Sequence, residues 1–182
     1  MTSRTYVTLG WESRFLSPIV RGNDFMGFMK AQSSDYKTGD SDVRPWGSYE
    51  VTEVGKTPDG KDYCNKTIVV NPGQILSLQS HKHRQELWNV AAGVLTVICD
   101  GERKMLKQGQ SVSIPLGAVH CMANLGDVPC VVSERQEGVC REDDITRYVD
   151  AYGRGVAQGG DKVRVSIALY EQILKEAGKS DG

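Results

Sequence analysis

The residues best suited to chemistry in this chain are its histidines, because an imidazole ring can ligate a metal ion or carry a proton near neutral pH. There are three of them, His81, His83 and His120. The first two lie in the run QSHKHRQE, which also offers Gln79 and Glu86 as oxygen donors. Imidazole nitrogens, a carboxylate and an amide oxygen together suit a divalent first-row ion. The sequence therefore predicts a metal site formed by this run and His120.

The run that contains His81 is expected to be the end of a β-strand. Successive side chains of a strand point to opposite faces, so Gln79, His81 and His83 would share one face. Alternation alone leaves open which of the three are ligands.

The elements that must position these residues are short strands. Between Arg44 and Arg154 the chain consists of β-rich runs separated by turn signals: YEVTEV, TIVV, QILSLQSH, LTVI, SVSIP and VPCVVSER. Such runs, with no long helical period between them, predict an all-β antiparallel sandwich or barrel. We expect the barrel to cover residues 42–154, after an N-terminal arm and linker over residues 1–41.

The last part of the chain, residues 155–182, is expected to be a glycine-rich joint followed by an amphipathic helix. Apolar residues recur at helical spacing from Val163 to Ala177, and Gly178 follows as a stop signal. The apolar face of this helix should dock on the barrel or on a neighbouring subunit.

Composition narrows the classes of partner. The 182 residues are 39% hydrophobic and 25% charged, with a net charge of -1, which is typical of one globular domain and excludes a general nucleic-acid or anionic-membrane partner. No leader sequence or membrane span is evident, so we expect a cytoplasmic protein. The five cysteines are widely spaced and form no CxxC motif, so we expect reduced thiols that mostly fill strand interiors.

Two segments resemble the paired motifs of the cupin superfamily, whose fold is a double-stranded β-helix, or jelly-roll barrel. The first reads G, five residues, Q-x-H, four residues, E, six residues, G, and the second reads P-x-G-x-x-H-x-x-x-N. The glutamine stands where the superfamily pattern has its first histidine. The resemblance implies that the ligands are Gln79, His81, Glu86 and His120, with His83 in reserve.

The implied ion is zinc, although iron, manganese, cobalt and nickel also suit this donor set. A neutral glutamine in place of a third imidazole keeps the ligand charge low, so that the ion can act as a Lewis acid toward a carbonyl or hydroxyl oxygen. The alternative is a barrel that carries these residues and binds no metal.

Longer segments resemble one cupin family more closely. RPWGSYEV, VNPGQILSLQSHKHRQELW, QSVSIPLGAVHCMAN and EDDITRYVDAYGR are similar to the cupin domain of type II mannose-6-phosphate isomerases, which is often the C-terminal half of a bifunctional enzyme with a mannose-1-phosphate guanylyltransferase. The resemblance covers residues 44–154. It implies an aldose-ketose isomerase that interconverts mannose 6-phosphate and fructose 6-phosphate through an enediol. We expect no guanylyltransferase domain, because no glycine-rich nucleotide loop is present.

Two departures bear on the substrate. The family commonly has three consecutive histidines where this chain has His81, Lys82 and His83, and a basic residue where this chain has Cys121. Side chains at a pocket mouth decide the match to phosphate and to sugar stereochemistry, so these changes put the exact sugar in question.

The implied reaction needs a general base and a cationic recess. His83 and Glu134 are the two candidates for the base. Basic residues of the family pattern are candidates for contact with the phosphate, and one of them, Lys66, is also a candidate catalytic residue. These basic residues are Arg44, Lys66, Arg147 and Arg154.

Two other functions compete with the isomerase. Two histidines and a carboxylate also suit a non-haem iron dioxygenase, although a Gln79 ligand would take a position that oxygen needs. A cupin that binds sugar phosphate without turning it over is the other alternative. A homodimer is expected, with the N-terminal arm and the tail helix as its contact elements.

Overall fold

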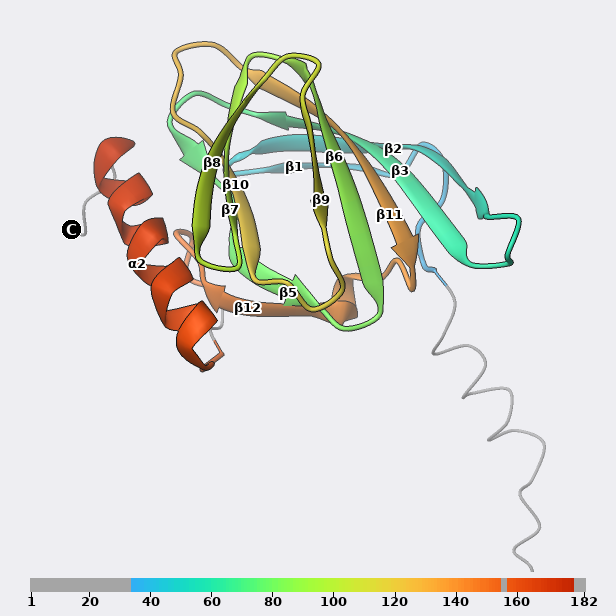
Figure 1. Ribbon diagram of the computed structural model, residues 1–182. Helices are drawn as coiled ribbons and strands as arrows, with labels where there is room; N and C mark the ends of the chain where they lie inside the picture. Colours follow the sequence, from blue (N-terminus) through green and yellow to red (C-terminus); the bar gives the residue numbers. More distant parts are fainter. Residues whose placement is uncertain (1–33, 155–156, 179–182) are drawn as a thin grey trace, which may run out of the picture. The chain divides into compact units, whose positions relative to one another are not determined.

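The computed structural model describes residues 34–154 and 157–178, so most of the predicted N-terminal arm lies outside the described residues. The described chain is two antiparallel sheets with one long helix, α2, beside them (Figure 1). One sheet has the order β1 (Ser41–Arg44), β2 (Gly47–Lys56), β3 (Asp62–Val70), β11 (Cys130–Gly138), β6 (Arg84–Ala92) and β9 (Ser111–Ile114). The other has the order β12 (Ile145–Val149), β5 (Leu78–His81), β10 (His120–Asn124), β7 (Val94–Cys99) and β8 (Glu102–Lys107), with β4 (Gln74–Ile75) paired to β10.

This arrangement confirms the all-β prediction and the double-stranded β-helix. The predicted β-rich runs fall largely within strands, with QILSLQSH divided between β4 and β5. The structure also contains strands that sequence reasoning did not single out: β1, β6, β8, β10 and β12. Several of them carry polar residues on their inner faces, so their apolar pattern is weak. Tertiary pairing, not local pattern, makes them strands.

The main core lies between the two sheets. Alternate residues of β3, β6 and β11 point inward, and they pack against residues of β7 and β10 in a cluster that contains Trp46 and Trp88. Trp88 is 2% exposed and belongs to this core. Trp46 is also buried, at the turn between β1 and β2.

Gly47 makes that turn possible. Its φ is +143°, and a Cβ built on it would lie 1.9 Å from the carbonyl oxygen of Val69. Only glycine allows β2 to approach β3 so closely here. Trp46 thus lies in a tight turn that ends at Gly47, and Arg44 pairs with Gly47 across it.

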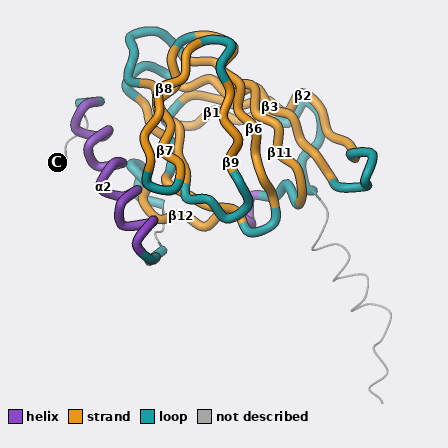
Figure 2. Tube along the Cα trace, in the orientation of Figure 1, coloured by secondary structure: helices purple, strands orange, loops and turns teal. Residues whose placement is uncertain are grey.

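Helix α2 (Asp161–Glu176) covers the outer face of the second sheet (Figure 2). Val163 and Tyr170 of the predicted stripe are buried against apolar residues of β4, β5, β7 and β10, and Ile173, which the stripe did not include, is buried with them. Arg103 and Glu176 form an ion pair at one end of the helix. The helix thus packs on the barrel through its apolar face, and a surface ion pair adds a second contact.

The five cysteines are free thiols, and four of them are buried, as predicted for strand filler. Burial raises their pKa values, for example to about 11 for Cys64, which disfavours the reactive thiolate form. Among the described residues no helix is long and apolar enough to cross a membrane.

Candidate metal centre

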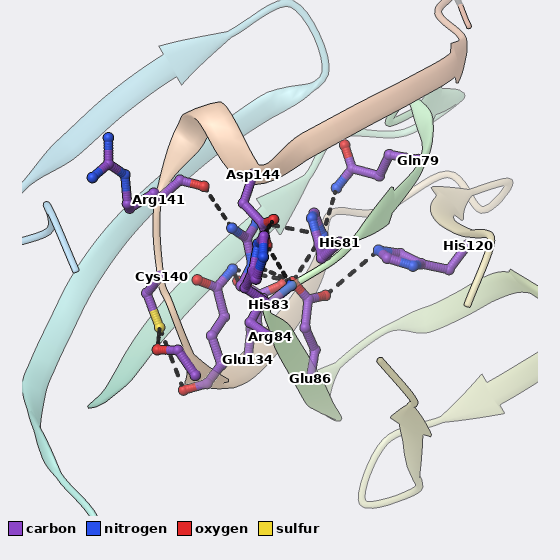
Figure 3. Close-up of polar contacts among 12 residues, drawn as sticks. Gln79, His81, His83, Arg84, Glu86, His120, Glu134, Cys140, Arg141 and Asp144 are labelled. Carbon is purple, nitrogen blue, oxygen red and sulfur yellow. Dashed lines mark hydrogen bonds and ion pairs between the residues drawn. The ribbon is translucent and has the colours of Figure 1, made fainter. Parts of the chain in front are cut away.

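The predicted ligands lie on three strands that meet inside the barrel. Gln79 and His81 are at the end of β5, and His120 opens β10, which pairs with β5 so that His120 lies opposite Gln79. Glu86 comes from β6 in the other sheet. The site therefore spans both sheets, and Figure 3 shows the side chains of Glu86 and His120 directed toward each other.

Three of the predicted ligands, His81, Glu86 and His120, form a compact, buried cluster. The Nε2 atom of His81 lies 3.1 Å from Oε1 of Glu86, and Nε2 of His120 lies 3.7 Å from Oε2 of the same carboxylate. One ligand atom from each residue lies within 4.8 Å of the others, close enough to hold one ion. All three side chains are at most 2% exposed.

The state of His120 fits a metal ligand. Its Nδ1 lies 2.8 Å from the carbonyl oxygen of Ala118, which can only accept, so Nδ1 carries the proton. Nε2 then presents a lone pair, and it is buried with no hydrogen-bond partner. Burial lowers the pKa of His120 to about 4 against the opposing effect of Glu86, so the ring is neutral. A buried acceptor without a donor is costly, and a cation would satisfy it.

The carboxylate of Glu86 fits as well. Burial by itself raises its pKa, but His81, His120 and Arg84 outweigh this effect and hold the pKa well below its usual range. Glu86 is therefore ionised in the interior, where only a hydrogen-bonded or metal-bound carboxylate is stable.

Gln79 lies at the edge of the cluster. Its Oε1 accepts a hydrogen bond from the hydroxyl of Ser77 at 2.8 Å, and its Nε2 lies 3.4 Å from Nε2 of His81. In this orientation the amide nitrogen, not the oxygen, faces the cluster. A half-turn of the amide would exchange them, and the Ser77 hydroxyl can accept as well as donate. The role of Gln79 as a ligand stays a prediction.

Residues that sequence reasoning missed complete a network around the two carboxylates. The indole N–H of Trp88 lies 3.0 Å from Oε2 of Glu86 and 3.2 Å from Oε1 of Glu134. The amide of Gln136 likewise donates to both, at 3.2 and 2.8 Å. Alternation along β6 and β11 could have shown that residues 84, 86, 88, 134 and 136 share the inner face, but only the register of the two strands shows that they meet.

Glu134 is a buried carboxyl group of a different kind. Burial and the nearby charge of Glu86 raise its pKa to about 8. Two neighbouring carboxyl groups thus have opposite pKa shifts, an arrangement typical of sites that separate a charged ligand from a proton-carrying group.

The cluster opens onto a recess of about 80 Å³. Gln79, Glu86 and Glu134 line its inner part. All the basic residues that the family pattern suggested also line it: Arg44, Lys66, Arg147 and Arg154. Residues from β1, β3, β12 and the following turn thus converge on one space, which the sequence could not reveal.

Three of the arginines that line the recess differ in their partners. Arg44 pairs with Asp42 at 2.8 Å, and Arg154 pairs with Asp150. The Nε of Arg147 is buried with no hydrogen-bond partner.

Lys66 is buried beneath aromatic rings. Its Nζ lies 3.6 Å from the centre of the Tyr36 ring. The phenol of Tyr36 in turn is hydrogen-bonded to Glu142.

His83 is placed outside this site. Strand β5 ends at His81, so alternation does not extend to His83, and the prediction that His83 lies on the metal-facing side is wrong. Its side chain is 64% exposed and its Nδ1 lies 2.8 Å from Asp144. The Asp144 carboxylate also accepts from the backbone N–H groups of Lys82 and His83, so this pair anchors the turn between β5 and β6.

A two-sheet barrel with a buried His-Glu-His cluster between its strands is the architecture of a cupin. The similarity of this chain to known proteins agrees with the cupin class. The family model described as "Mannose-6-phosphate isomerase C-terminal" matches residues 31–150, and the chain belongs to that family.

Curated relatives extend beyond this chain. It is 44% identical over 112 residues to a mannose-1-phosphate guanylyltransferase of Escherichia coli K12, covering 61% of this chain and 22% of the relative. It is 45% identical over 112 residues to the alginate biosynthesis protein AlgA of Pseudomonas aeruginosa, with the same coverage. The chain thus matches about a fifth of the length of these relatives.

A solved structure supports the fold alone. The capsular polysaccharide assembling protein CapF of Staphylococcus aureus superposes with a TM-score of 0.52 at 20% identity, over 59% of this chain and 33% of CapF.

Proposed function

We propose that this protein is a metal-dependent aldose-ketose isomerase that acts on a sugar phosphate, such as mannose 6-phosphate and fructose 6-phosphate. One observation carries the proposal. A buried cluster of metal-ligand type and a buried carboxyl group, Glu134, open onto the same recess as four basic side chains. Membership of the isomerase family supports the choice of substrate class.

His81, Glu86 and His120 would hold the ion, with Gln79 as a fourth ligand after its amide turns. Zinc is our first choice, and iron, manganese, cobalt and nickel suit the same donors. When bound, the ion would polarise adjacent oxygens of the open-chain sugar, where negative charge develops.

Glu134 is the better of the two candidate bases, because it lines the recess and His83 does not. As a carboxylate it would take the proton from C2 of the aldose and return it to C1, while the proton of the O2 hydroxyl passes to O1, so that the substrate goes through an enediol. A base with a raised pKa binds that proton more strongly. Lys66 lies directly across from Glu134 in the β3–β11 pairing and supplies a positive charge beside it.

The phosphate would bind at the mouth of the recess. The net charge of the protein is only -1, so a binding site for a dianion must come from local basic residues. Arg147 is the strongest candidate, because its unpartnered Nε needs an acceptor. Arg44, Arg154 and Lys66 add positive charge around it.

The test is isomerase activity on a panel of phosphorylated and free aldoses, with the full chain stripped of metal and then reloaded with zinc. We expect activity on a sugar phosphate that is lost on stripping and restored by zinc. Tight sugar-phosphate binding without turnover would instead indicate a binding module. Stoichiometric iron with oxygen uptake would indicate the dioxygenase alternative.

The homodimer and the cytoplasmic location expected from the sequence stay predictions. Light scattering on the purified full chain tests the first of them.

A further inference from the structure

Arg84 is a buried cation in direct contact with the ligand cluster. It is 3% exposed at the start of β6. Its Nε lies 3.2 Å from Oε1 of Glu86, and its Nη2 lies 3.3 Å from Nε2 of His81. Its Nη1 donates to the carbonyl oxygen of Arg141 at 2.6 Å. One guanidinium therefore joins two predicted ligands to the loop before β12 (Figure 3).

The contact with His81 is made at Nε2, the ring nitrogen that lies beside Glu86 and that an ion shared with this carboxylate would need. Nε2 of His81 lies between an acceptor, Glu86, and a donor, Arg84. A neutral ring can donate or accept at that atom but not both, and a ligand must present the lone pair there. The guanidinium of Arg84 has only N–H donors, so it competes with the ion for the lone pair on Nε2 of His81.

Charge adds to this competition. A guanidinium does not lose its proton in proteins, so Arg84 keeps a full positive charge beside Glu86 at any working pH. That charge stabilises the buried carboxylate when no metal is bound. It also opposes the approach of a divalent cation to the same oxygens.

We propose that Arg84 acts as a resident cation that keeps the ligand cluster assembled without metal and is displaced from His81 when the ion binds. Its anchor on Arg141 allows it to leave His81 while staying inside the barrel. Arg84 thereby weakens metal affinity and makes loading reversible. This inference rests on the metal-binding part of the proposed function.

The first test is calorimetric titration of zinc into the metal-stripped full chain, comparing the wild type with the neutral variants Arg84→Met and Arg84→Gln. Removing a fixed charge next to the ion should tighten zinc binding at least about tenfold. The metal-stripped variants should melt at lower temperature than the wild type, and zinc should narrow or reverse the difference. A folded neutral variant that binds zinc no more tightly than the wild type overturns the inference.

A second measurement needs no folded neutral variant. In an NMR spectrum of the wild type with labelled arginine, the Arg84 guanidinium signal is assigned as the one absent from Arg84→Lys. Saturation with zinc should shift its Nη signal and speed its exchange with solvent, because contact with His81 is lost. An Arg84 signal that does not move at zinc saturation refutes the displacement. Failure of the wild type to bind zinc refutes the metal site itself, and so separates the two proposals.

Discussion

The inner end of the recess and its mouth differ in how their charges are held. At the inner end, His81, Glu86 and His120 are almost fully buried, and the N–H groups of Trp88 and Gln136 donate to Glu86. At the mouth, the arginine side chains keep a quarter to a third of their surface exposed, for example 24% for Arg147. Buried polar groups with fixed partners are rigid, whereas exposed ion pairs are screened and exchange partners easily.

Under the proposed function, this difference would separate the chemical step from substrate recognition. The inner end can hold ligand atoms in one geometry, as catalysis requires. The mouth can release an arginine from its carboxylate partner and offer it to a phosphate. Substitutions at the inner end should therefore abolish turnover, and those at the mouth should mainly weaken binding.

The largest effect is expected from His120→Ala. It removes a ligand whose Nε2 has no other partner, so the variant should lose its metal and at least about 10³-fold in activity. Elemental analysis and the isomerase assay measure both. His83→Ala is the matched control and should keep both, because His83 is exposed and outside the recess. Full metal content in His120→Ala would contradict the site.

The second-largest effect is expected from Glu134→Gln. The amide keeps the shape of the side chain but cannot accept a proton, so kcat should fall about 10²-fold to 10⁴-fold while metal content is unchanged. Glu50→Gln, an exposed acidic residue on β2, is the control and should leave kcat as it was. A variant with normal kcat would exclude Glu134 as the base.

The variant Arg147→Met tests whether the mouth of the recess binds the phosphate. Loss of a charged donor should raise KM for the sugar phosphate about tenfold or more, with a smaller change in kcat. Arg135→Met on β11 is the control, because Arg135 does not line the recess. The same change in KM for an unphosphorylated aldose would show that Arg147 does not contact the phosphate.

The smallest expected effect is a change in the way that the stability of the protein depends on pH. The pKa of Glu134 is raised to about 8 in the folded protein, so folding favours its protonated form. Its contribution to stability is therefore complete in acid and is lost as pH rises through about 8. Melting curves of the metal-stripped protein should show the wild type falling relative to Glu134→Gln between about pH 5 and about pH 8. A pH-independent difference would mean that the carboxyl group is not perturbed.

Much of the site was predictable because it follows local spacing. The motif resemblance pointed to His81, Glu86 and His120, and the structure brings these three together. Alternation failed for His83 because it assumes a continuing strand, and β5 ends two residues earlier.

Arg84, Trp88 and Gln136 were missed for a different reason. Their importance depends on the pairing of β6 with β11, in which Trp88 and Glu134 are 46 residues apart in the sequence and Glu86 and Gln136 are 50 apart. Such long-range register is decided by the packing of the whole barrel, so no local window contains it.

The sequence by itself determined the class of fold, the helix at the end of the chain and the types of ligand, since these depend on residue pattern and spacing. The tertiary structure alone decided that four distant basic side chains share one recess with a buried carboxyl group. It also decided that Glu86 is charged and Glu134 favours its proton, because burial and neighbouring charges, not residue type, set those pKa values.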